Sequence, residues 1–545
     1  MKTLVIFFGK YRNYVLVVLF ALIALFPLFH EGLIPTHDGE YHVVRFAQFY
    51  KVLNEGTLYP RWAPDFNNGY GIPLFNYQYP LPNYISSLFH IFGISFIDSF
   101  KLNLIFATIF SAVFMYLWSK SYWGTLGGIV SSIFYTFAPY RFVDIYVRGS
   151  VGEVWALAFA PAVLWCLRDY SVTKKRNNVI LGGIFLALLI YSHNILALLF
   201  FTFIGFYMFY LFLINEDKKR IIRGFIIIIL LGLGISAPFF LPALFETKYV
   251  TGLQVFDITK NFPEVYELIF PSWGSGFSDS LSSNPLSYQI GVINLAVIAL
   301  IITRLIRSFI KKGKIKSITI FTLLAFFISV FLMLPYSAIV WKAAPLLSYF
   351  QFPWRILSLT ILLISFLAGS LFEKISKKTM ILSAVLIIVL VLSTISYTKP
   401  AYYLVRSDSY YLTRSNFIDG TNSPGNAFNT KWFSSIPPKK PLVRIIKGNT
   451  VVKVLINKST KKSFKFISKD GSAILFSIAY FPGWKAKLNG KSLQIQNSNG
   501  IIMVNVPKGK NKVELIFSDT PIRTVASVVF FLSLLVLPFL IIVLV

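Results

Sequence analysis

The chain has 545 residues, of which 56% are hydrophobic and only 14% are charged, and its mean hydropathy is +0.67. Its repeated apolar runs reach the roughly 20 residues that a helix needs to cross a bilayer, which excludes a soluble globular domain. The formal net charge of +30 must then lie in loops or in a domain outside the bilayer. The sequence therefore predicts an α-helical polytopic membrane protein.

Apolar runs in chain order predict about twelve transmembrane helices. They cover residues 12–29, 101–118, 121–138, 153–170, 178–193, 195–214, 222–243, 288–307, 317–334, 355–372, 379–397 and 524–545. Each run is expected to be helical, because backbone groups exposed to lipid must bond within their own segment. The apolar segment 84–96 is short for a crossing, so we expect an interfacial or re-entrant helix within the first long loop.

Basic residues alternate between the predicted loops. The N-terminal segment and every second loop carry Lys and Arg, from Lys2 and Arg12 to Lys377 and Lys378, whereas the other loops are longer and more aromatic. Short cytoplasmic loops collect Lys and Arg, so we expect a multi-pass protein of the cell membrane with a cytoplasmic N-terminus. The first apolar run is expected to be a signal anchor, because no small-x-small cleavage site follows it.

Two segments are expected on the extracytoplasmic side. Residues 30–100 form a first outer loop rich in Tyr, Pro, Asn and Gly, and residues 398–520 show alternating apolar residues instead of helical runs. This alternation predicts strands beginning at Val451, Ser463, Ser472, Ile501 and Lys512, with tight turns at Asn489-Gly490 and Asn499-Gly500. We expect a membrane domain over 1–397, an extracytoplasmic β-sandwich over 398–520 and a final transmembrane helix over 521–545.

The predicted β-domain carries twenty Lys and Arg residues against five Asp and Glu, about half of the excess positive charge. Such a surface suits anionic lipid headgroups or an anionic polymer, and it equally suits a solvated lysine-rich face. We do not expect nucleic acid as a partner of an outward-facing domain. The bilayer is the first partner that the sequence implies.

The first outer loop opens with PTHDGEYH, which runs from Pro35 to His42 and places two carboxylates and two of the five histidines at the predicted membrane boundary. If a helix begins near Asp38, then at about 100° per residue Asp38, His42 and Arg45 share one face and Glu40 points away. These three side chains together could deprotonate a hydroxyl and hold a phosphate. Alternatively, Asp38 is a plain helix N-cap with solvated neighbours.

The same stretch contains residue types that bind divalent cations, namely His37, Asp38, Glu40 and His42. Residues two apart on a helix do not converge on one ion, however, and no second ligand cluster is visible. There is also no P-loop and no dinucleotide-binding fingerprint. We therefore expect no metal and no other cofactor, with a divalent ion near His37 and Asp38 as the alternative.

Further candidate residues lie at predicted outer helix ends and in the first loop. Arg148 and Glu153 occur in YVRGSVGEVWA, and Arg355 occurs in FQFPWRILS. A charge at this depth indicates a functional site, although Arg148 and Glu153 could instead pair with each other or extend to the surface. First-loop aromatics such as Trp62 and Tyr77 suit either an interfacial belt or stacking on a sugar ring.

Several strings together resemble known families. The chain is similar to bacterial membrane proteins labelled 6-pyruvoyl-tetrahydropterin synthase-related, and to YfhO-like membrane proteins, in HDGEYH, LYPRWAPDFNNGYGIPLFNYQYPLPNY, APYRFVDIYVRGSVGE, QFPWR and YFPGWKAKLNGK. Both families resemble the GT-C superfamily of polytopic glycosyltransferases. The resemblance implies a GT-C-like fold and transfer of a sugar from a polyprenyl-phosphate donor to a glycan, lipid or protein acceptor at the outer membrane face.

In that superfamily an acidic residue soon after the first helix acts as the base, and it matches Asp38 best, with Glu40 as second candidate. No phosphate ligand can be assigned by motif, so the substrate-binding candidates rest on chemistry: His42, Arg45, Arg61, Trp62, Tyr77, Arg148, Glu153 and Arg355. The pterin label implies no pterin chemistry, because no histidine triad of a zinc-dependent synthase is visible. The alternative function is a non-catalytic transporter or assembly factor for lipid-linked glycans, since one sequence does not demonstrate turnover.

Overall fold

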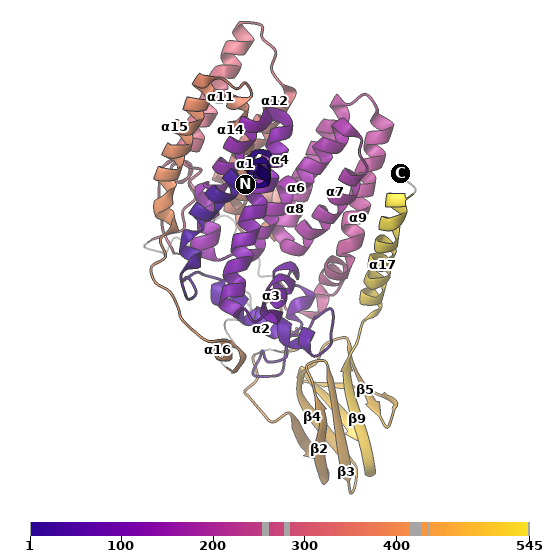
Figure 1. Ribbon diagram of the computed structural model, residues 1–545. Coiled ribbons are helices and arrows are strands. Elements are labelled where there is room, and N and C mark those ends of the chain that lie inside the picture. The colour runs from indigo at the N-terminus through magenta and orange to yellow at the C-terminus, as the bar shows by residue number, and fades with distance from the viewer. Residues whose placement is uncertain (1, 253–260, 277–283, 414–426, 434, 543–545) are drawn as a thin grey trace.

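The computed structural model describes residues 2–252, 261–276, 284–413, 427–433 and 435–542. Long helices form a bundle, and a sheet domain extends from one end of it (Figure 1). The bundle contains α1 (Lys2–Ala24), α4 (Phe96–Thr136), α6 (Val151–Thr173), α7 (Asn177–Ser192), α8 (Asn194–Ile214), α9 (Lys218–Phe245), α11 (Val292–Ile310), α12 (Ser317–Met333), α14 (Leu357–Gly369), α15 (Lys377–Thr394) and α17 (Pro521–Ile542). Shorter helices are α2 (Gly39–Asn54), α3 (Leu81–Ile91), α5 (Pro139–Phe142), α10 (Val265–Ile269), α13 (Ala338–Ala343) and α16 (Asp408–Thr413).

Eight helices among the described residues are long and apolar enough to cross a membrane. The number is nine if Ser317–Met333 and Pro335–Ala343, which are bent by 88°, count as one span, and Tyr11–Ala24 and Asn177–Ser192 are shorter apolar helices. The predicted polytopic membrane class is confirmed. The predicted number of twelve is reached only when the bent pair, the two short helices and two separate arms of α4 are all counted.

Helix α4 turns back on itself at Gly124, whose φ of 71° lies in the left-handed region. Ser132 donates a hydrogen bond of 2.7 Å to the backbone oxygen of Ala112 across this turn. Residues 20 positions apart in one straight helix would be about 30 Å apart. The two arms therefore run side by side, and they occupy the positions of the two predicted runs 101–118 and 121–138.

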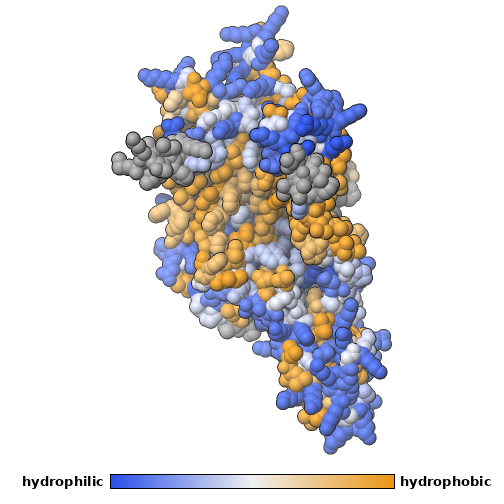
Figure 2. All heavy atoms as spheres, turned by 45° about the vertical axis from the view of Figure 1, so that its right-hand side comes forward, coloured by the Kyte–Doolittle hydropathy of each residue, from blue (hydrophilic) through white to orange (hydrophobic). Residues whose placement is uncertain are grey.

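On the face shown in Figure 2, apolar side chains form a band across the bundle, with hydrophilic residues above and below it. The basic loops between α6 and α7, α8 and α9, α11 and α12, and α14 and α15 all lie at one end. Helices α2 and α3 and the sheet domain lie at the other end (Figure 1). Helix α3 has 11 residues, about half of what a crossing requires, and it lies beside α2 in the first loop.

The sheet domain contains two antiparallel sheets, with strand orders β1–β4–β8–β7 and β2–β3–β9–β5–β6. The strands are β1 (Val443–Lys447), β2 (Thr450–Asn457), β3 (Lys461–Ser468), β4 (Ser472–Ala479), β5 (Trp484–Leu488), β6 (Lys491–Leu493), β7 (Gln496–Ser498), β8 (Ile501–Val506) and β9 (Gly509–Phe517). All five predicted strands are present. Asn489-Gly490 and Asn499-Gly500 have positive φ at both residues, as in the favoured two-residue hairpin turn.

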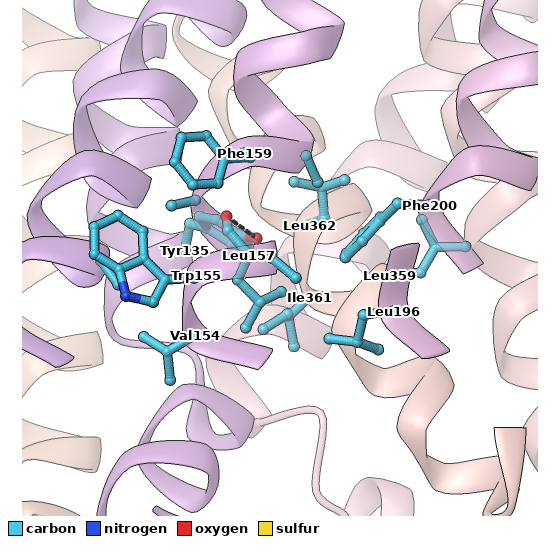
Figure 3. Close-up of a cluster of buried hydrophobic side chains, with 14 of the residues drawn as sticks. Tyr135, Val154, Trp155, Leu157, Phe159, Leu196, Phe200, Leu359, Ile361 and Leu362 are labelled. Atoms are coloured by element: carbon cyan, nitrogen blue, oxygen red, sulfur yellow. Dashed lines mark hydrogen bonds between the residues drawn. The ribbon is translucent and has the colours of Figure 1, made fainter. Parts of the chain in front are cut away.

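The apolar core of the bundle lies where α4, α6, α8 and α14 meet (Figure 3). Leu157 of α6, Phe200 of α8 and Leu362 of α14 are almost completely buried there. The hydroxyl of Tyr135 donates a hydrogen bond of 2.9 Å to the backbone oxygen of Leu157. Helix α14 is buried along nearly its whole length, whereas α15 and α17 lie at the periphery. The core therefore fixes the starts of α6 and α14, where the polar residues described next are found.

Candidate functional site

Polar side chains from several segments meet at the end of the core next to α2. The segments are the start of α2, the π-helical turn η3 (Val143–Arg148) before α6, the junction of α7 and α8 at His193, and the short helix η8 (Pro353–Ile356) before α14. The backbone N–H of Asp38 donates to the carbonyl of Arg148 at 2.9 Å. A side chain at Gly149, whose φ is +65°, would collide with Thr36. This close approach positions Asp38 beside η3.

Asp38 occupies the N-cap position of α2, but its side chain caps nothing. The Oγ1 atom of Thr36 accepts the N–H of Gly39 instead, at 3.1 Å. Within the described residues the Asp38 carboxylate makes no hydrogen bond and no ion pair, although its charge acts on Arg45 and Arg355. A role as helix N-cap accounts for the position of Asp38 in the chain. It does not account for the carboxylate, which has no partner among the described residues.

His42 and Arg45 share the face of α2 that carries Asp38, as the helix period predicts. The ring of His42 is buried against Phe46, Tyr79 and Phe100, at centroid distances of 6.1, 6.4 and 6.2 Å. Burial lowers the pKa of His42 well below its usual value, and the positive charge of Arg45 adds to this effect. His42 is therefore neutral at pH 7. The Nε atom of Arg45 is buried without an acceptor in the described part of the chain.

Arg148 is fully engaged by two buried carboxylates. Its two terminal nitrogens each bind one oxygen of Glu153 at 2.6 Å, and Nη1 also binds Asp144 at 2.6 Å. Both carboxylates are completely buried, and the guanidinium lies 4.9 Å above the ring of Trp354. Mutual pairing of Arg148 and Glu153 was one of the two alternatives from the sequence, and it is the one that the structure shows.

Arg355 is held less completely than Arg148. Its Nε lies 3.4 Å from Glu153, and Nη1 donates to the carbonyl of Phe350 at 3.0 Å and to Gln351 at 2.7 Å. The second terminal nitrogen, Nη2, has no partner among the residues that the structure describes. Arg355 and Arg45 are thus two guanidinium groups with unused donors near the Asp38 carboxylate.

The other sequence candidates, Glu40, Arg61, Trp62 and Tyr77, do not lie in the cluster around Asp38. Glu40 forms an ion pair with Arg406. Arg61 binds Asn76 and the carbonyl of Pro238, both at 3.1 Å. The remaining two are Trp62, which packs against Phe481, Trp484 and Phe517 of the sheet domain, and Tyr77, whose hydroxyl donates to the backbone oxygen of Glu246 at 2.7 Å. Arg61, Trp62 and Tyr77 therefore join the first loop to α9 and the sheet domain.

Three residues of the site are not among the catalytic and substrate-binding candidates chosen from the sequence, although Tyr79 is one of the first-loop aromatics. Tyr79 lies 4.9 Å from the ring of His193, and the Asp38 charge acts on it. The Nε2 atom of His193 is 3.8 Å from Glu153. Asp144 precedes Arg148 by four residues, the spacing at which an acid and a base pair on a helix. That spacing was a usable signal for Asp144, whereas Tyr79 and His193 are brought in by tertiary contacts.

Few side chains in the structure are placed to bind a divalent metal ion near His37 and Asp38. No group of three or more His, Cys, Asp or Glu side chains suited to a metal ion occurs within the described ranges. His37 donates from Nε2 to the carbonyl of Ser275 at 2.8 Å, and Glu40 is paired with Arg406. Two of the four ligand-type side chains of PTHDGEYH, those of His37 and Glu40, are thus held by separate partners.

Comparison with family models identifies the membrane domain. Residues 75–401 match the family described as 6-pyruvoyl-tetrahydropterin synthase related domain, membrane protein. The chain belongs to this family. Residues 443–528 match a second family model, bacterial membrane protein YfhO. In this 6-pyruvoyl-tetrahydropterin synthase-related protein, the first match includes Arg148, Glu153 and Arg355, whereas Asp38 and Arg45 precede it.

Individual proteins give weaker similarities. An uncharacterized protein of Lactococcus lactis subsp. cremoris strain MG1363 is 22% identical over 252 residues, which is 44% of this chain and 41% of that one. The crystal structure of the apo Archaeoglobus fulgidus oligosaccharyltransferase matches with a TM-score of 0.47 and 11% identity, over 74% of this chain and 56% of that one. The mycobacterial arabinofuranosyltransferase AftD matches with a TM-score of 0.42 and 14% identity, over 78% and 28%. The chain thus spans about half or less of the length of these proteins.

Acid pH is expected to destabilise this family member through His193. Burial lowers the pKa of His193 to about 3, with the positive charges of Arg355 and Arg148 adding to the effect, against about 6.5 in an unfolded chain. Between these values the unfolded chain binds a proton that the folded protein does not. Stability is therefore full above about pH 6.5 and falls below it by about 1.4 kcal/mol per pH unit. The melting temperature in detergent should be lower at about pH 5.5 than at about pH 7.5.

The matched control for this prediction is His193→Asn. Asn is a good N-cap, so it can replace the Nδ1 atom of His193 that accepts the N–H of Leu196 at 3.3 Å, and it does not titrate. The melting temperature of the variant should depend less on pH. An equal fall in both proteins would assign the acid sensitivity to other groups.

Proposed function

We propose that the protein transfers a sugar from a polyprenyl-phosphate donor to an acceptor at the end of the bundle that carries α2. The observation that carries this proposal is the Asp38 carboxylate, which has no partner among the described residues and lies near two guanidinium groups with unused donors. An acceptor nucleophile needs a base, and a departing phosphate needs positive charge. The resemblance of the first-loop motif to GT-C glycosyltransferases supports the same assignment.

The reaction that fits these groups is a direct displacement at the anomeric carbon. Asp38 takes the proton of the acceptor, whose oxygen or nitrogen forms a bond to the anomeric carbon while the bond from that carbon to the phosphate oxygen breaks. The electron pair leaves with the polyprenyl phosphate, and Arg45 and Arg355 stabilise its charge. Displacement in one step inverts the anomeric configuration, so NMR of a product linkage that shows retention would contradict this route.

Arg148 has a different part in this proposal. Its guanidinium is neutralised by Asp144 and Glu153, so it holds the start of α6 in place and does not bind the donor. Glu153 also lies next to Nε of Arg355, which orients that guanidinium with its remaining donor unused. The buried carboxylates and Arg148 are thus positioning residues for Arg355.

The proposed orientation places the site outside the cell. The basic loops gather at the opposite end of the bundle (Figure 1), and the positive-inside rule assigns that end to the cytoplasm. The apolar band then ends close to α2 (Figure 2), at the depth where the phosphate of a membrane-anchored polyprenyl chain lies. The sheet domain is extracytoplasmic in this orientation.

Binding of undecaprenyl phosphate to the purified protein in nanodiscs tests the phosphate site. Arg355→Gln or Arg45→Gln should weaken saturable binding at least about tenfold, because each removes a charge-assisted hydrogen bond worth roughly 1.5–3 kcal/mol. Lys51→Gln is the matched control, since Lys51 lies on the same helix and pairs with Asp65 at 2.8 Å. The proposal fails if wild type shows no saturable binding, or if Lys51→Gln weakens binding as much as the two arginine changes.

Sugar transfer should also be independent of added divalent metal. The two guanidinium groups supply the positive charge that a metal ion would otherwise give to the leaving phosphate. Treatment with EDTA should leave the transfer rate within about twofold of the untreated rate. Loss of activity with EDTA and recovery with Mg²⁺ or Mn²⁺ would show that the Asp38 site works with a metal.

A further inference from the structure

A second cluster of positive charge surrounds a small cavity at the opposite end of the bundle. The cavity is about 70 Å³ in volume, and its lining includes Arg304, Ser308, Lys314, Lys316, Thr319 and Trp123. These residues come from α11, the connection to α12, the start of α12 and the turn of α4. The cavity has room for several water molecules, and therefore for one tetrahedral oxyanion.

Two of the cationic groups are held in fixed positions. Nη1 of Arg304 donates to the carbonyl of Ser370 at 2.6 Å, which leaves its other nitrogens without a partner in the described part of the chain. Nζ of Lys316 donates to the carbonyl of Tyr122 at 2.9 Å and pairs with Glu373 at 2.6 Å. Glu373 also lines the cavity, so three basic groups face one carboxylate. The net charge around the cavity is positive.

Trp123 helps to hold one of these cations in place. Nζ of Lys316 lies over its ring, 5.2 Å from the ring centroid, and a cation over an aromatic face is attracted to it. Helix α12 also begins here, at Ser317, and the N-terminus of a helix favours a negative charge. An anion in this cavity would meet a helix start and three cations.

We propose that this cavity binds the phosphate group of an anionic membrane lipid. Leu300 lies one turn before Arg304 on α11, and Ile320 follows Thr319 on α12. Both are 45% exposed and lie on the side of the cavity toward the middle of the bundle, which is the expected position of acyl chains below a bound headgroup. Basic cavities between helices at the cytoplasmic surface are suited to lipid headgroups. A free phosphate ion would use the same donors but would not need the exposed apolar side chains. This site lies at the other end of the bundle from Asp38 and does not depend on the transferase proposal.

Native mass spectrometry of protein released from nanodiscs that contain phosphatidylglycerol and phosphatidylcholine tests the site. Wild type should retain one phosphatidylglycerol, and Arg304→Gln and Lys314→Gln should each reduce the retained fraction about tenfold. Lys314 makes no described hydrogen bond or ion pair, so Lys314→Gln keeps the fold even if Arg304→Gln does not. Lys219→Gln is the matched control, because Lys219 is an exposed basic residue at the start of α9 outside the cavity. No retained lipid in wild type, or equal loss in Lys219→Gln, overturns the proposal.

A second measurement separates a lipid from a free anion. Phosphatidylglycerol should raise the melting temperature of wild type in detergent, and this rise should be absent in Lys314→Gln. Inorganic phosphate at millimolar concentration should not reproduce it. If inorganic phosphate gives the full rise and phosphatidylglycerol gives none, the cavity is a site for a soluble anion and the lipid assignment is wrong.

Discussion

Asp38→Asn should abolish sugar transfer and leave donor binding intact. The amide cannot accept the proton of the acceptor, and a positioned general base typically contributes about 100- to 10,000-fold to a rate. The carboxylate makes no described contact that the fold needs, and the side chains that would hold the phosphate are those of Arg45 and Arg355. The transfer rate should therefore fall at least about 100-fold, while the affinity for undecaprenyl phosphate stays within about twofold.

The measurement uses membrane vesicles that contain the protein and the cell's own envelope acceptors. Release of labelled hexose from undecaprenyl-phosphate-linked hexose is followed in wild type, Asp38→Asn and Glu40→Gln. Glu40 is the matched control, because it is the other acid of the same motif and is paired with Arg406 on a different face of α2. Loss of transfer only in Glu40→Gln would move the base to Glu40. Equal release of hexose in all three proteins and in vesicles that lack the protein would favour the non-catalytic transporter.

Elements with a strong local signal could be predicted from the sequence. The five predicted strands, including β2 and β4, each have six or more residues with alternating or continuous apolar character. The four strands that were not predicted have three to five residues, and β6 and β7 read KSL and QNS. Such segments are strands because they pair with the adjacent strand across a tight turn, β6 with β5 and β7 with β8, and three mostly polar residues are too few to show an alternating apolar pattern.

Of the candidate site, only the residues that share one face of α2 could be predicted from the sequence. The spacing of Asp38, His42 and Arg45 is a property of α2 alone, so the helix period was sufficient. The contacts of Trp62 with Phe481 and Trp484 join residues more than 400 positions apart. No periodicity within the first loop could show that Trp62 packs against the sheet domain and is unavailable to a sugar.

The pairing of Arg148 with Glu153 could be predicted in part, because it depends on both a local turn and a tertiary contact. The two residues are five positions apart, and Gly149 between them has a φ of +65°, so they do not lie on one continuous helix. Sequence spacing alone left pairing and phosphate binding as equal alternatives. The left-handed turn at Gly149, together with the tertiary contact of Thr36, brings the guanidinium onto both carboxylate oxygens.

Arg148→Gln should therefore reduce the amount of folded protein and not only its affinity for a phosphate. The change leaves Asp144 and Glu153 buried without their main counter-charge, and removing one partner of a buried ion pair typically costs about 3–5 kcal/mol. The melting temperature in detergent should fall by several degrees, with a matching loss of monodisperse protein. Arg355→Gln is the comparison, because Arg355 is paired less closely with Glu153 and its loss should mainly weaken lipid binding.

The double variant Arg148→Gln, Glu153→Gln distinguishes the effect of an unpaired buried charge from the effect of the altered side-chain packing. It removes one buried carboxylate together with the guanidinium. Its melting temperature should therefore lie between those of Arg148→Gln and wild type, as expected when two mutated residues interact directly. Arg355 would still lose Glu153 as its neighbour, and donor binding should stay weak. The contrary result would be an Arg148→Gln protein that melts at the wild-type temperature but does not bind undecaprenyl phosphate. Arg148 would then be a direct ligand of the donor, and its ion pair with Glu153 would have to open when the donor binds.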